Sequence, residues 1–296
     1  MTTARRSESS DPTTARRSES SDPTTARRSD SSNMTTTPPI PPYPKGKDLL
    51  ADKVVVVTAA AGTGIGSAVA QRSLEEGARV VISDWHERRL AEKADELAAD
   101  HADRVHAIAC DVTSEDHVQS LMDGAADHFG RIDVLVNNAG LGGTKSIVDM
   151  TDDEWSRVLD VTLNGTFRAT RAALRRFIDQ GGGGAIVNNA SVVGWRAQAE
   201  QSHYAAAKAG VMALTRCAAV DVAEHGIRVN AVAPSLAMHP FLAKVTTDEL
   251  LAELEKREVF GRAAQPWEVA NVMVFLASEY ASYLTGEVIS VSSQHP

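Results

Sequence analysis

Tyr204 and Lys208 stand four residues apart in an alanine-rich segment, Tyr204-Ala205-Ala206-Ala207-Lys208. Alanine favours helix, and residues at i and i+4 share one helix face, so the two side chains are predicted to lie together. Because a neighbouring cation favours the phenolate, we expect Lys208 to lower the pKa of Tyr204 toward neutrality. Such a tyrosine can exchange a proton with an alcohol or a carbonyl. A solvated helix face would show the same spacing, so the pair needs support from the rest of the chain.

A glycine-rich turn follows a strongly apolar segment near residue 54. The four valines Val54–Val57 are typical of a parallel strand buried on both faces. Gly62, Gly64 and Gly66 follow, and residues 67–76 are predicted to form a helix. Strand, glycine turn and helix in this order indicate a phosphate-binding unit, because the N–H groups at the helix N-terminus attract a pyrophosphate.

The next predicted strand, residues 79–83, leads into Asp84, 18 residues after Gly66. A carboxylate at this position accepts hydrogen bonds from the two hydroxyls of an adenosine ribose and repels a 2′-phosphate. Asp84 therefore favours NAD(H) over NADP(H) as the cofactor. Arg88 and Arg89, one turn further along the chain, weaken this preference.

The elements that position these residues alternate between strands and helices. Further strands are predicted at residues 105–109, 134–137, 185–189, 228–232 and 287–291. Further helices are predicted at residues 86–100, 114–129, 152–179, 202–224 and 266–277. This alternation predicts a single-domain α/β fold, a Rossmann-like doubly wound parallel β-sheet with helices on both faces. Ligands of such sheets bind beyond the carboxyl ends of the strands, where the motifs lie.

Residues 1–44 are expected to form a tail and lead-in outside a catalytic domain of residues 45–296. Residues 2–34 contain three copies of an 11-residue repeat rich in Ser, Thr, Arg and Asp, which predicts disorder. Residues 38–44 are rich in proline and are predicted to be extended. Met34 is a candidate for the natural start of the chain, a hypothesis that the intact mass of the native protein tests.

Composition argues against several classes of function. The net charge of −9 disfavours nucleic-acid binding, and the lack of a long apolar run leads us to expect a cytoplasmic protein that does not span a membrane. Cys110 and Cys217 lie in apolar segments and are expected to be buried free thiols. The histidine spacing predicts no metal site, and His203, His239 and His295 are not expected to be ligands.

Taken together, the motifs resemble those of the short-chain dehydrogenase/reductase family. Between about Lys53 and Val291 they are Gly64-Ile65-Gly66, Asp84, Cys110-Asp111-Val112, Asn137-Asn138-Ala139-Gly140, Asn164, Ser191, and Tyr204 with Lys208. The resemblance implies hydride transfer between a nicotinamide cofactor and a secondary alcohol or ketone. It implies that Tyr204 is the general acid/base, that Ser191 orients the substrate oxygen and that Lys208 binds the nicotinamide ribose. Asn164 would hold a water that links Lys208 to solvent.

The resemblance also implies a set of cofactor contacts. The residues concerned are Thr63, Gly64, Ile65, Gly66, Asp84, Asp111, Val112, Asn138, Ala139, Gly140, Tyr204, Lys208 and Pro234. Taken singly, Ser191 could be a loop serine, Asn164 a surface residue and Asp111 a helix cap. Their joint occurrence in one order favours the functional interpretation.

The chain departs from the usual family pattern at both ends of the expected site. Ala59 stands where the first glycine of the turn is usual, and the turn is one residue longer than the common form. Ser235 stands where a glycine usually follows the proline, and His239 where a threonine often contacts the cofactor amide. The C-terminal Ser292-Ser293-Gln294 replaces the usual Asp-Gly-Gly. We expect these changes to reshape the nicotinamide end and its rim.

Substrate contacts are expected from residues 141–146, 192–201 and a lid-like, helix-rich segment, 236–262. The apolar side chains there are Trp195, Met238, Phe241, Leu242 and Phe260. They favour an alicyclic or steroid-derived alcohol. The candidates for binding an anionic group are Lys145, Arg196 and Lys244, although a solvated rim is an equal explanation for each.

Three segments resemble an actinobacterial branch of the family that acts in steroid C/D-ring breakdown. They are Thr58–Gly66, Gly194-Trp195-Arg196-Ala197 and Pro234–Phe241. The substrates of that branch are CoA thioesters of hydroxylated methyl-indanone acids. The alternatives are another alicyclic or 3-oxoacyl ketone, a non-catalytic NAD-sensing Rossmann protein, and a scaffold that acts through the repeat tail. The resemblance further implies a homo-oligomer, either a dimer or a tetramer.

Overall fold

The computed structural model describes residues 38–238 and 248–294. Some predictions concern residues outside these ranges. They are the repeat tail with Met34, the lid residues His239, Phe241, Leu242 and Lys244, and the C-terminal His295.

A parallel sheet of seven strands forms the centre of the described residues, in the order β3-β2-β1-β4-β5-β6-β7. The strands are β1 (Val54–Val57), β2 (Arg79–Asp84), β3 (Val105–Ala109), β4 (Val134–Asn137), β5 (Gly184–Asn189), β6 (Ile227–Pro234) and β7 (Val288–Val291). Every valine of β1 is fully buried, as expected for a central strand covered on both faces. The chain order reverses between β1 and β4, which makes the switch point predicted from the alternating elements.

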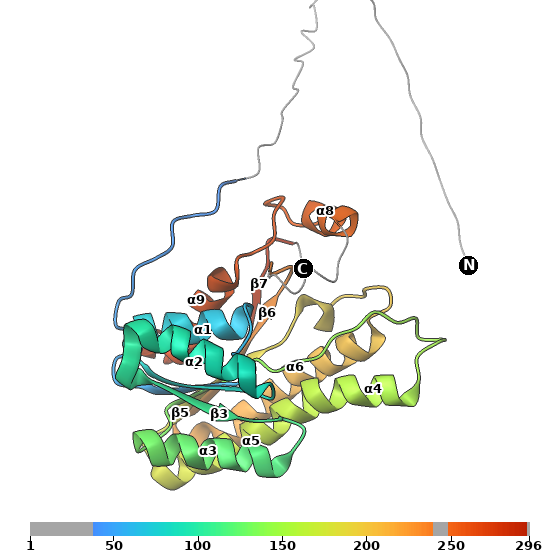
Figure 1. Ribbon diagram of the computed structural model, residues 1–296. Helices are drawn as coiled ribbons and strands as arrows, with labels where there is room; N and C mark the ends of the chain where they lie inside the picture. Colours follow the sequence, from blue (N-terminus) through green and yellow to red (C-terminus); the bar gives the residue numbers. More distant parts are fainter. Residues whose placement is uncertain (1–37, 239–247, 295–296) are drawn as a thin grey trace, which may run out of the picture. The chain divides into compact units, whose positions relative to one another are not determined.

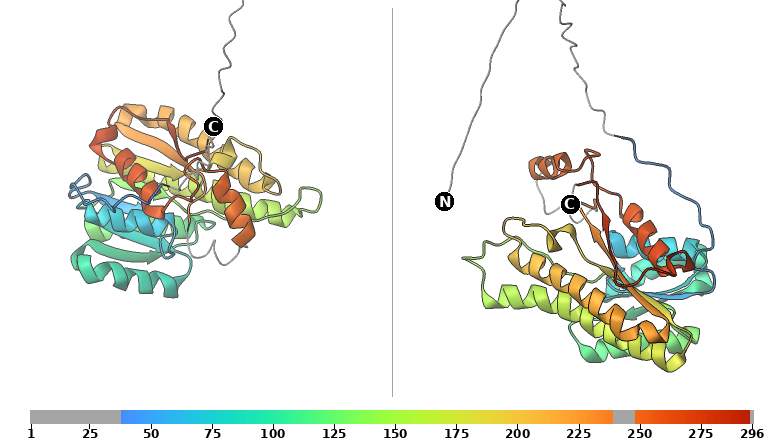
Figure 2. Two further views of the ribbon diagram at one scale, coloured as in Figure 1. Left: turned by 90° about the horizontal axis from the view of Figure 1, so that it is seen from above. Right: turned by 180° about the vertical axis from the view of Figure 1, so that it is seen from behind.

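Helices cover both faces of the sheet (Figures 1 and 2). They are α1 (Ile65–Glu75), α2 (Glu87–His101), α3 (Glu115–Phe129), α4 (Asp152–Leu159), α5 (Gly165–Gln180), α6 (Ser202–Val222), α8 (Asp248–Lys256) and α9 (Pro266–Ala277). Buried apolar residues of α1, α2 and α9 pack on one face, and those of α3, α5 and α6 pack on the other. The predicted α/β doubly wound fold is confirmed.

The predicted helix over residues 152–179 is interrupted. A π-helical turn, Asp160–Asn164, separates α4 from α5. Gly165 follows this turn, and a β-carbon there would lie 2.7 Å from Cγ2 of Val112. Close packing against Val112 therefore accompanies the extra residue in the helix, and π-turns of this kind are frequent at functional sites.

The expectation for the cysteines is correct for one and wrong for the other. Both thiols are free, Cys110 is buried, and Cys217 is exposed. Cys217 belongs to α6, which is apolar around much of its circumference, so local composition does not indicate which face meets solvent. The neighbouring Val220 is also exposed on this helix.

The lead-in before β1 contacts the folded part. The ring of Tyr43 packs edge-on against Trp267 of α9, with centroids 5.3 Å apart. Arg72 of α1 lies over the same ring and donates a hydrogen bond to the carbonyl of Pro44 at 3.1 Å. Within the described residues, no helix is both long enough and apolar enough to cross a membrane.

Candidate active site

A cavity of about 910 Å³ opens at the carboxyl ends of the strands around the β1–β4 switch point. Six predicted site residues line it: Asp84, Asp111, Val112, Ala139, Gly140 and Asn164. The walls come from the ends of β2, β3 and β4 and from α4 with its π-turn. The prediction that the motifs meet at this edge of the sheet is therefore matched by the tertiary arrangement of these six residues.

The glycine turn is joined to β4 through Asn138 and Thr58. The Asn138 amide donates to the carbonyls of Thr58 and Ala59, at 3.2 and 3.1 Å. The Thr58 hydroxyl accepts from the N–H groups of Asn138 and Ala139, both at 3.0 Å. A β-carbon on Gly66 would lie 2.5 Å from the Ala59 carbonyl oxygen, so only glycine fits there. Gly64 caps α1 without a side chain, which leaves the N–H groups of that helix end open to an anion.

Ala59 occupies a backbone conformation that favours glycine. Its φ angle is +52°, in the left-handed region, where a β-carbon approaches the carbonyl oxygen. The replacement of the usual glycine by Ala59 therefore leaves strain in the turn that borders the cavity.

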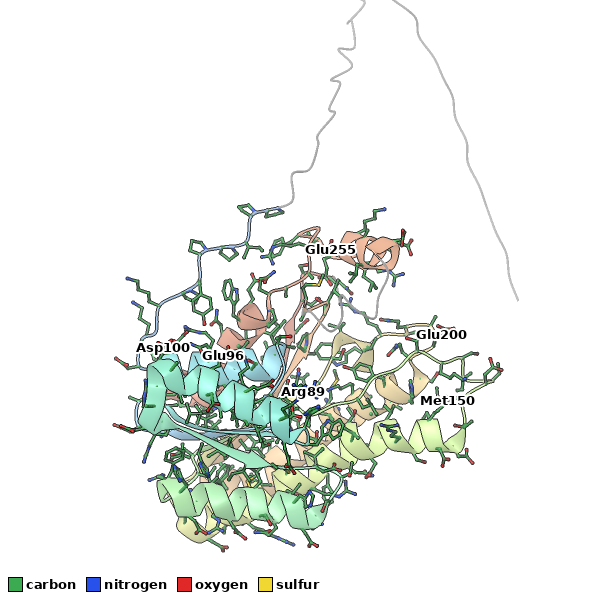
Figure 3. All side chains as sticks on the ribbon, viewed as in Figure 1. Arg89, Glu96, Asp100, Met150, Glu200 and Glu255 are labelled. Atoms are coloured by element: carbon green, nitrogen blue, oxygen red, sulfur yellow. The ribbon has the colours of Figure 1, made fainter. Side chains whose placement is uncertain are left out.

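Asp84 ends β2 and is 7% exposed. Its carboxylate accepts from the N–H groups of Ala61 and His86, at 3.3 and 3.0 Å, which leaves acceptor capacity for a ribose. Of the two arginines that weaken the preference for NAD(H), Arg89 lines the cavity, and Figure 3 labels it near the start of α2. Arg88 instead pairs with Glu92 at 3.2 Å on the surface.

Asp111 and Val112 lie in the turn after β3. The Asp111 carboxylate accepts from the N–H and the hydroxyl of Thr113, at 2.9 and 2.8 Å. Ser114, and not Asp111, caps α3 by accepting from the N–H of His117. The helix-cap interpretation of Asp111 is therefore wrong, and its carboxylate stands on the cavity wall instead.

Tyr204, Lys208 and Ser191 come together beside the cavity. Lys208 is buried, donates to the carbonyl of Asn189, and places Nζ 5.5 Å from the centroid of the Tyr204 ring. Ser191, which follows β5, lies close enough to Tyr204 to influence the pKa of its phenol. The predicted helical spacing of the pair is present, since both residues belong to α6.

The pKa shifts in this cluster differ from the expectation. Burial raises the pKa of Tyr204, and the hydrogen bond with Ser191 opposes this rise. Burial lowers the pKa of Lys208 to about 8, because desolvation penalises its charge. The predicted lowering of the Tyr204 pKa by Lys208 is therefore not found in the chain alone. The lysine donates to a backbone carbonyl, and burial disfavours its charged form.

Asn164 belongs to the π-turn and lines the cavity. Its amide donates to the Asp160 carboxylate at 3.2 Å. Thr162, in the same turn, is fully buried and exchanges hydrogen bonds with both backbone groups of Leu141. A β-carbon on Gly140 would lie 3.5 Å from Nζ of Lys208 and 3.8 Å from the Thr162 hydroxyl. Gly140 thus lies beside both the π-turn and Lys208, at distances that a β-carbon would meet as ordinary contacts.

Asn189 is a site residue that the sequence analysis missed. Its carbonyl accepts from Lys208, and its amide donates to Oδ1 of Asn138 at 3.0 Å, which connects the glycine turn to the acid/base pair. Its own Oδ1 is buried and has no hydrogen-bond partner among residues 38–238 and 248–294. A polar residue at the end of the apolar strand β5 was the available signal.

The residues present fit a nicotinamide dinucleotide. The open end of α1 suits a pyrophosphate, and Asp84 and the orphaned Oδ1 of Asn189 are acceptors suited to ribose hydroxyls. The remaining predicted contacts do not line the cavity. Thr63 is exposed, Ile65 begins α1, and Pro234 is buried at the end of β6.

Two of the three segments expected to contact the substrate, residues 141–146 and 192–201, lie close together. Gln201 donates to the Gly143 carbonyl at 2.7 Å, and the N–H of Lys145 donates to the Glu200 carbonyl at 2.9 Å. The loops before α4 and α6 therefore lie side by side, as the labels of Met150 and Glu200 in Figure 3 show. The Lys145 ammonium pairs with Glu154 at 3.7 Å on the surface.

The expected apolar substrate pocket is only partly described. Trp195 and Phe260 are about half exposed, and Met238 is partly buried. The lid-like segment contains α8, which Figure 1 shows near the ends of β6 and β7. No group of three or more metal-ligating side chains occurs in the part of the chain that the structure describes.

Comparisons with known proteins agree on one family. A family model described as enoyl-(acyl carrier protein) reductase matches residues 59–293. The chain is 66% identical, over 251 residues, to a (5R,7aS)-5-hydroxy-7a-methyl-1-oxo-2,3,5,6,7,7a-hexahydro-1H-indene-carboxyl-CoA reductase of Mycobacterium tuberculosis, covering 85% of this chain and 96% of that protein. It is 45% identical to a cis-4-hydroxycyclohexanecarboxylate dehydrogenase of Sinomonas cyclohexanicum, covering 82% and 96%.

A solved structure gives the same result. The crystal structure of a short chain dehydrogenase from Mycobacterium smegmatis matches with a TM-score of 0.78 and 58% identity, covering 86% of this chain and 98% of that one.

Proposed function

The chain belongs to the short-chain dehydrogenase/reductase family, and we propose that it interconverts a ring ketone and a secondary alcohol on a hydroxylated methyl-indanone CoA thioester. The 66% identical mycobacterial relative is named for such a substrate. The Sinomonas relative is named for a ring alcohol that bears a carboxylate. The observation that carries the proposal is the meeting of Ser191, Tyr204 and Lys208 beside a cavity suited to a dinucleotide.

The chemistry at the substrate oxygen follows from these side chains. Ser191, which lies near Tyr204, holds the oxygen of the ketone or alcohol next to the phenol. Because burial raises its pKa, Tyr204 is protonated at neutral pH and gives its proton to the carbonyl oxygen during reduction. In the reverse direction the phenolate form of Tyr204, which Lys208 stabilises, accepts the alcohol proton.

The nicotinamide ring, when bound, supplies or accepts the hydride. Asp84 accepts from the adenosine ribose, and Asp111 with Val112 borders the adenine. The pyrophosphate would lie at the N-terminus of α1, which is presented by Thr63, Gly64, Ile65 and Gly66. The nicotinamide half would be held by Asn138, Ala139, Gly140, Pro234 and Lys208. Asn164 would hold the water through which Lys208 exchanges protons with solvent.

NAD(H) is the preferred cofactor in this proposal. The support is the position of Asp84 on the cavity wall with acceptor capacity to spare. Arg89 on the same wall provides a counterion for a 2′-phosphate and limits the preference. NADP(H) is therefore expected to be used as well, but less efficiently than NAD(H).

We also propose that α5 and α6 pair between copies of the chain. These helices expose Phe167, Ile178 and Val220, which would be buried in such a contact. Light scattering of the full chain distinguishes a dimer or tetramer from a monomer.

The test uses the CoA thioester for which the mycobacterial relative is named, with NAD⁺ and NADH, followed by the absorbance of the reduced nicotinamide. The protein should turn the substrate over, and Tyr204→Phe should reduce kcat/KM by about 1,000-fold, since general acid/base catalysis contributes in this range. NADH binding should be retained in the variant.

Tyr280→Phe is the matched control, because Tyr280 is 77% exposed and distant in sequence from the site. It should keep full activity. Full activity of Tyr204→Phe would overturn the assignment of the proton donor, and no turnover by the unmodified protein would overturn the substrate class.

A further inference from the structure

Two departures from the family pattern meet at one buried carboxylate, Glu258, which is 4% exposed and follows α8. Its Oε2 accepts from the hydroxyls of Ser235 and Ser293, at 3.0 and 2.7 Å. Its Oε1 accepts from the Gln294 amide at 2.7 Å and from the N–H of Leu236 at 3.3 Å. Ser235, Glu258, Ser293 and Gln294 together are called the Glu258 brace below. The brace joins the end of β6, the segment after α8 and the C-terminal segment.

The brace fixes the orientation of Gln294. Because its NH₂ group donates to Glu258, its carbonyl oxygen must face the other way. That oxygen accepts from Nη1 of Arg196 at 2.6 Å. Arg196 follows Ser191 by five residues in the loop that leads to α6. The buried carboxylate therefore acts through Gln294 to hold one side of the Arg196 guanidinium.

The other edge of this guanidinium has no acceptor. Nε and Nη2 of Arg196 are buried and lack a hydrogen-bond partner among the residues that the structure describes. These two nitrogens form one edge of the planar group, the edge that binds two oxygens or one oxygen in a fork. Buried donors of a cation without acceptors destabilise a protein, so this edge is explained best by an acceptor that arrives with a ligand.

The loop that carries Arg196 is fixed relative to the acid/base pair. The N–H of Arg196 donates to the Val192 carbonyl at 3.1 Å, within the short helical turn that Ser191 caps. A β-carbon on Gly194 would lie 3.1 Å from the backbone of Lys208, so the loop packs directly on α6. The backbone of Arg196 is thereby held in a fixed position relative to Ser191 and α6.

We infer that Arg196 is a specificity-determining residue whose Nε–H and Nη2–H bind an acyl oxygen carried on the ring of the substrate. This inference rests on the proposed function and deepens it. A thioester carbonyl and a carboxylate both offer the oxygen that such an edge recognises, whereas a ring with only alkyl substituents offers none. The brace positions Arg196, and Arg196 selects substrates with an acyl group at a set distance from the ketone.

Three ring ketones test the inference: 4-oxocyclohexanecarboxyl-CoA, 4-oxocyclohexanecarboxylate and 4-methylcyclohexanone. They share the reacting carbonyl and differ in the acyl oxygen. Arg196→Met removes the donors and keeps most of the side-chain volume. It should lower kcat/KM for the CoA thioester by about 10- to 100-fold, the range for a charge-assisted hydrogen bond, and change that for 4-methylcyclohexanone less than about 2-fold. The carboxylate arm shows whether a free acid is recognised as well.

Two further variants separate positioning from folding. Gln294→Ala should raise KM for the CoA thioester more than it lowers kcat, and should have no further effect in an Arg196→Met background. Arg175→Met, which removes an exposed arginine of α5, is the control and should leave all three substrates unchanged. NADH binding, followed by fluorescence, should be the same in every variant.

An equal loss on all three ketones, or no loss on the CoA thioester, would overturn the role of Arg196. If the unmodified protein reduces none of the three, the proposed function fails separately. Calorimetric binding of 4-oxocyclohexanecarboxyl-CoA still decides on Arg196 in that case. Weaker binding by Arg196→Met supports the inference, and equal binding overturns it.

Discussion

The cofactor side and the substrate side of the site are built in different ways. Around β1, β2 and β4, the chain presents backbone groups, glycines and Asp84, and apart from Ala59 and the longer turn it follows the family motifs. In the segment after β6 and in the C-terminal segment, partly buried side chains that depart from the family pattern are joined through the buried Glu258. In the roles proposed above, the first side holds the cofactor and the second selects the substrate.

The physical reason lies in what each side must recognise. A pyrophosphate and a ribose are common to all reactions with this cofactor, and backbone N–H groups and one carboxylate suffice for them. A substrate differs between enzymes, so its recognition depends on side chains whose positions are specific to this chain. If the two sides are independent, substitutions on the substrate side should leave NADH binding intact, and substitutions on the cofactor side should leave substrate binding intact.

The largest effect is expected from Glu258→Ala, on the substrate side. Four hydrogen bonds to the carboxylate disappear, which leaves partly buried donors without acceptors. The free energy of unfolding should fall by about 3 kcal/mol, as measured by urea denaturation. KM for the CoA thioester should rise because Arg196 loses its support, whereas the Kd for NADH should be unchanged.

Glu253→Ala serves as the control, since it removes an exposed carboxylate from α8. It should change neither stability nor KM by much. A clear loss of NADH affinity in Glu258→Ala would break the separation between the two sides.

A smaller effect is expected from Asp84→Asn, on the cofactor side. The amide keeps the shape of the side chain and removes the charge that repels a 2′-phosphate. The ratio of kcat/KM for NADP⁺ to that for NAD⁺ should rise by at least about 10-fold, in line with the loss of one nearby like charge. The rise should be smaller when Arg89 is also changed to Gln.

The matched control is Glu87→Gln, an exposed carboxylate in the first turn of α2. It should leave the cofactor ratio unchanged. An unchanged ratio in Asp84→Asn would remove Asp84 from the ribose site, and a changed KM for 4-methylcyclohexanone would show that the two sides are coupled.

The smallest effect is expected from Ala59→Gly, which restores the usual residue of the turn. Because φ is +52° at this position, glycine removes the steric penalty of the β-carbon, and the free energy of unfolding should rise by about 1 kcal/mol. Ala60→Gly, at a buried neighbour outside the left-handed region, should instead destabilise the protein. Destabilisation by Ala59→Gly would show that the β-carbon makes favourable contacts that outweigh the strain.

The fold could be predicted because its signals are local. The valines of β1 and the alternation of strands and helices placed most elements within one or two residues of their observed ends. The π-turn before Gly165 was missed, because no local pattern marks it and its close contact with Val112 comes from a distant part of the chain. Cys217 was misplaced for a related reason, since an apolar helix does not reveal which face its neighbours cover.

By itself, the sequence determined that Tyr204 and Lys208 lie one turn apart on the same helix, because their spacing is a property of five consecutive residues. It likewise determined that Asp84 and the glycine turn lie at strand ends. Tertiary structure decided the rest. Burial raises the pKa of Tyr204 and lowers that of Lys208, and burial depends on the whole fold. Glu258 meets Ser235 and Gln294 across wide gaps in sequence, so only the folded chain brings these groups within hydrogen-bonding distance.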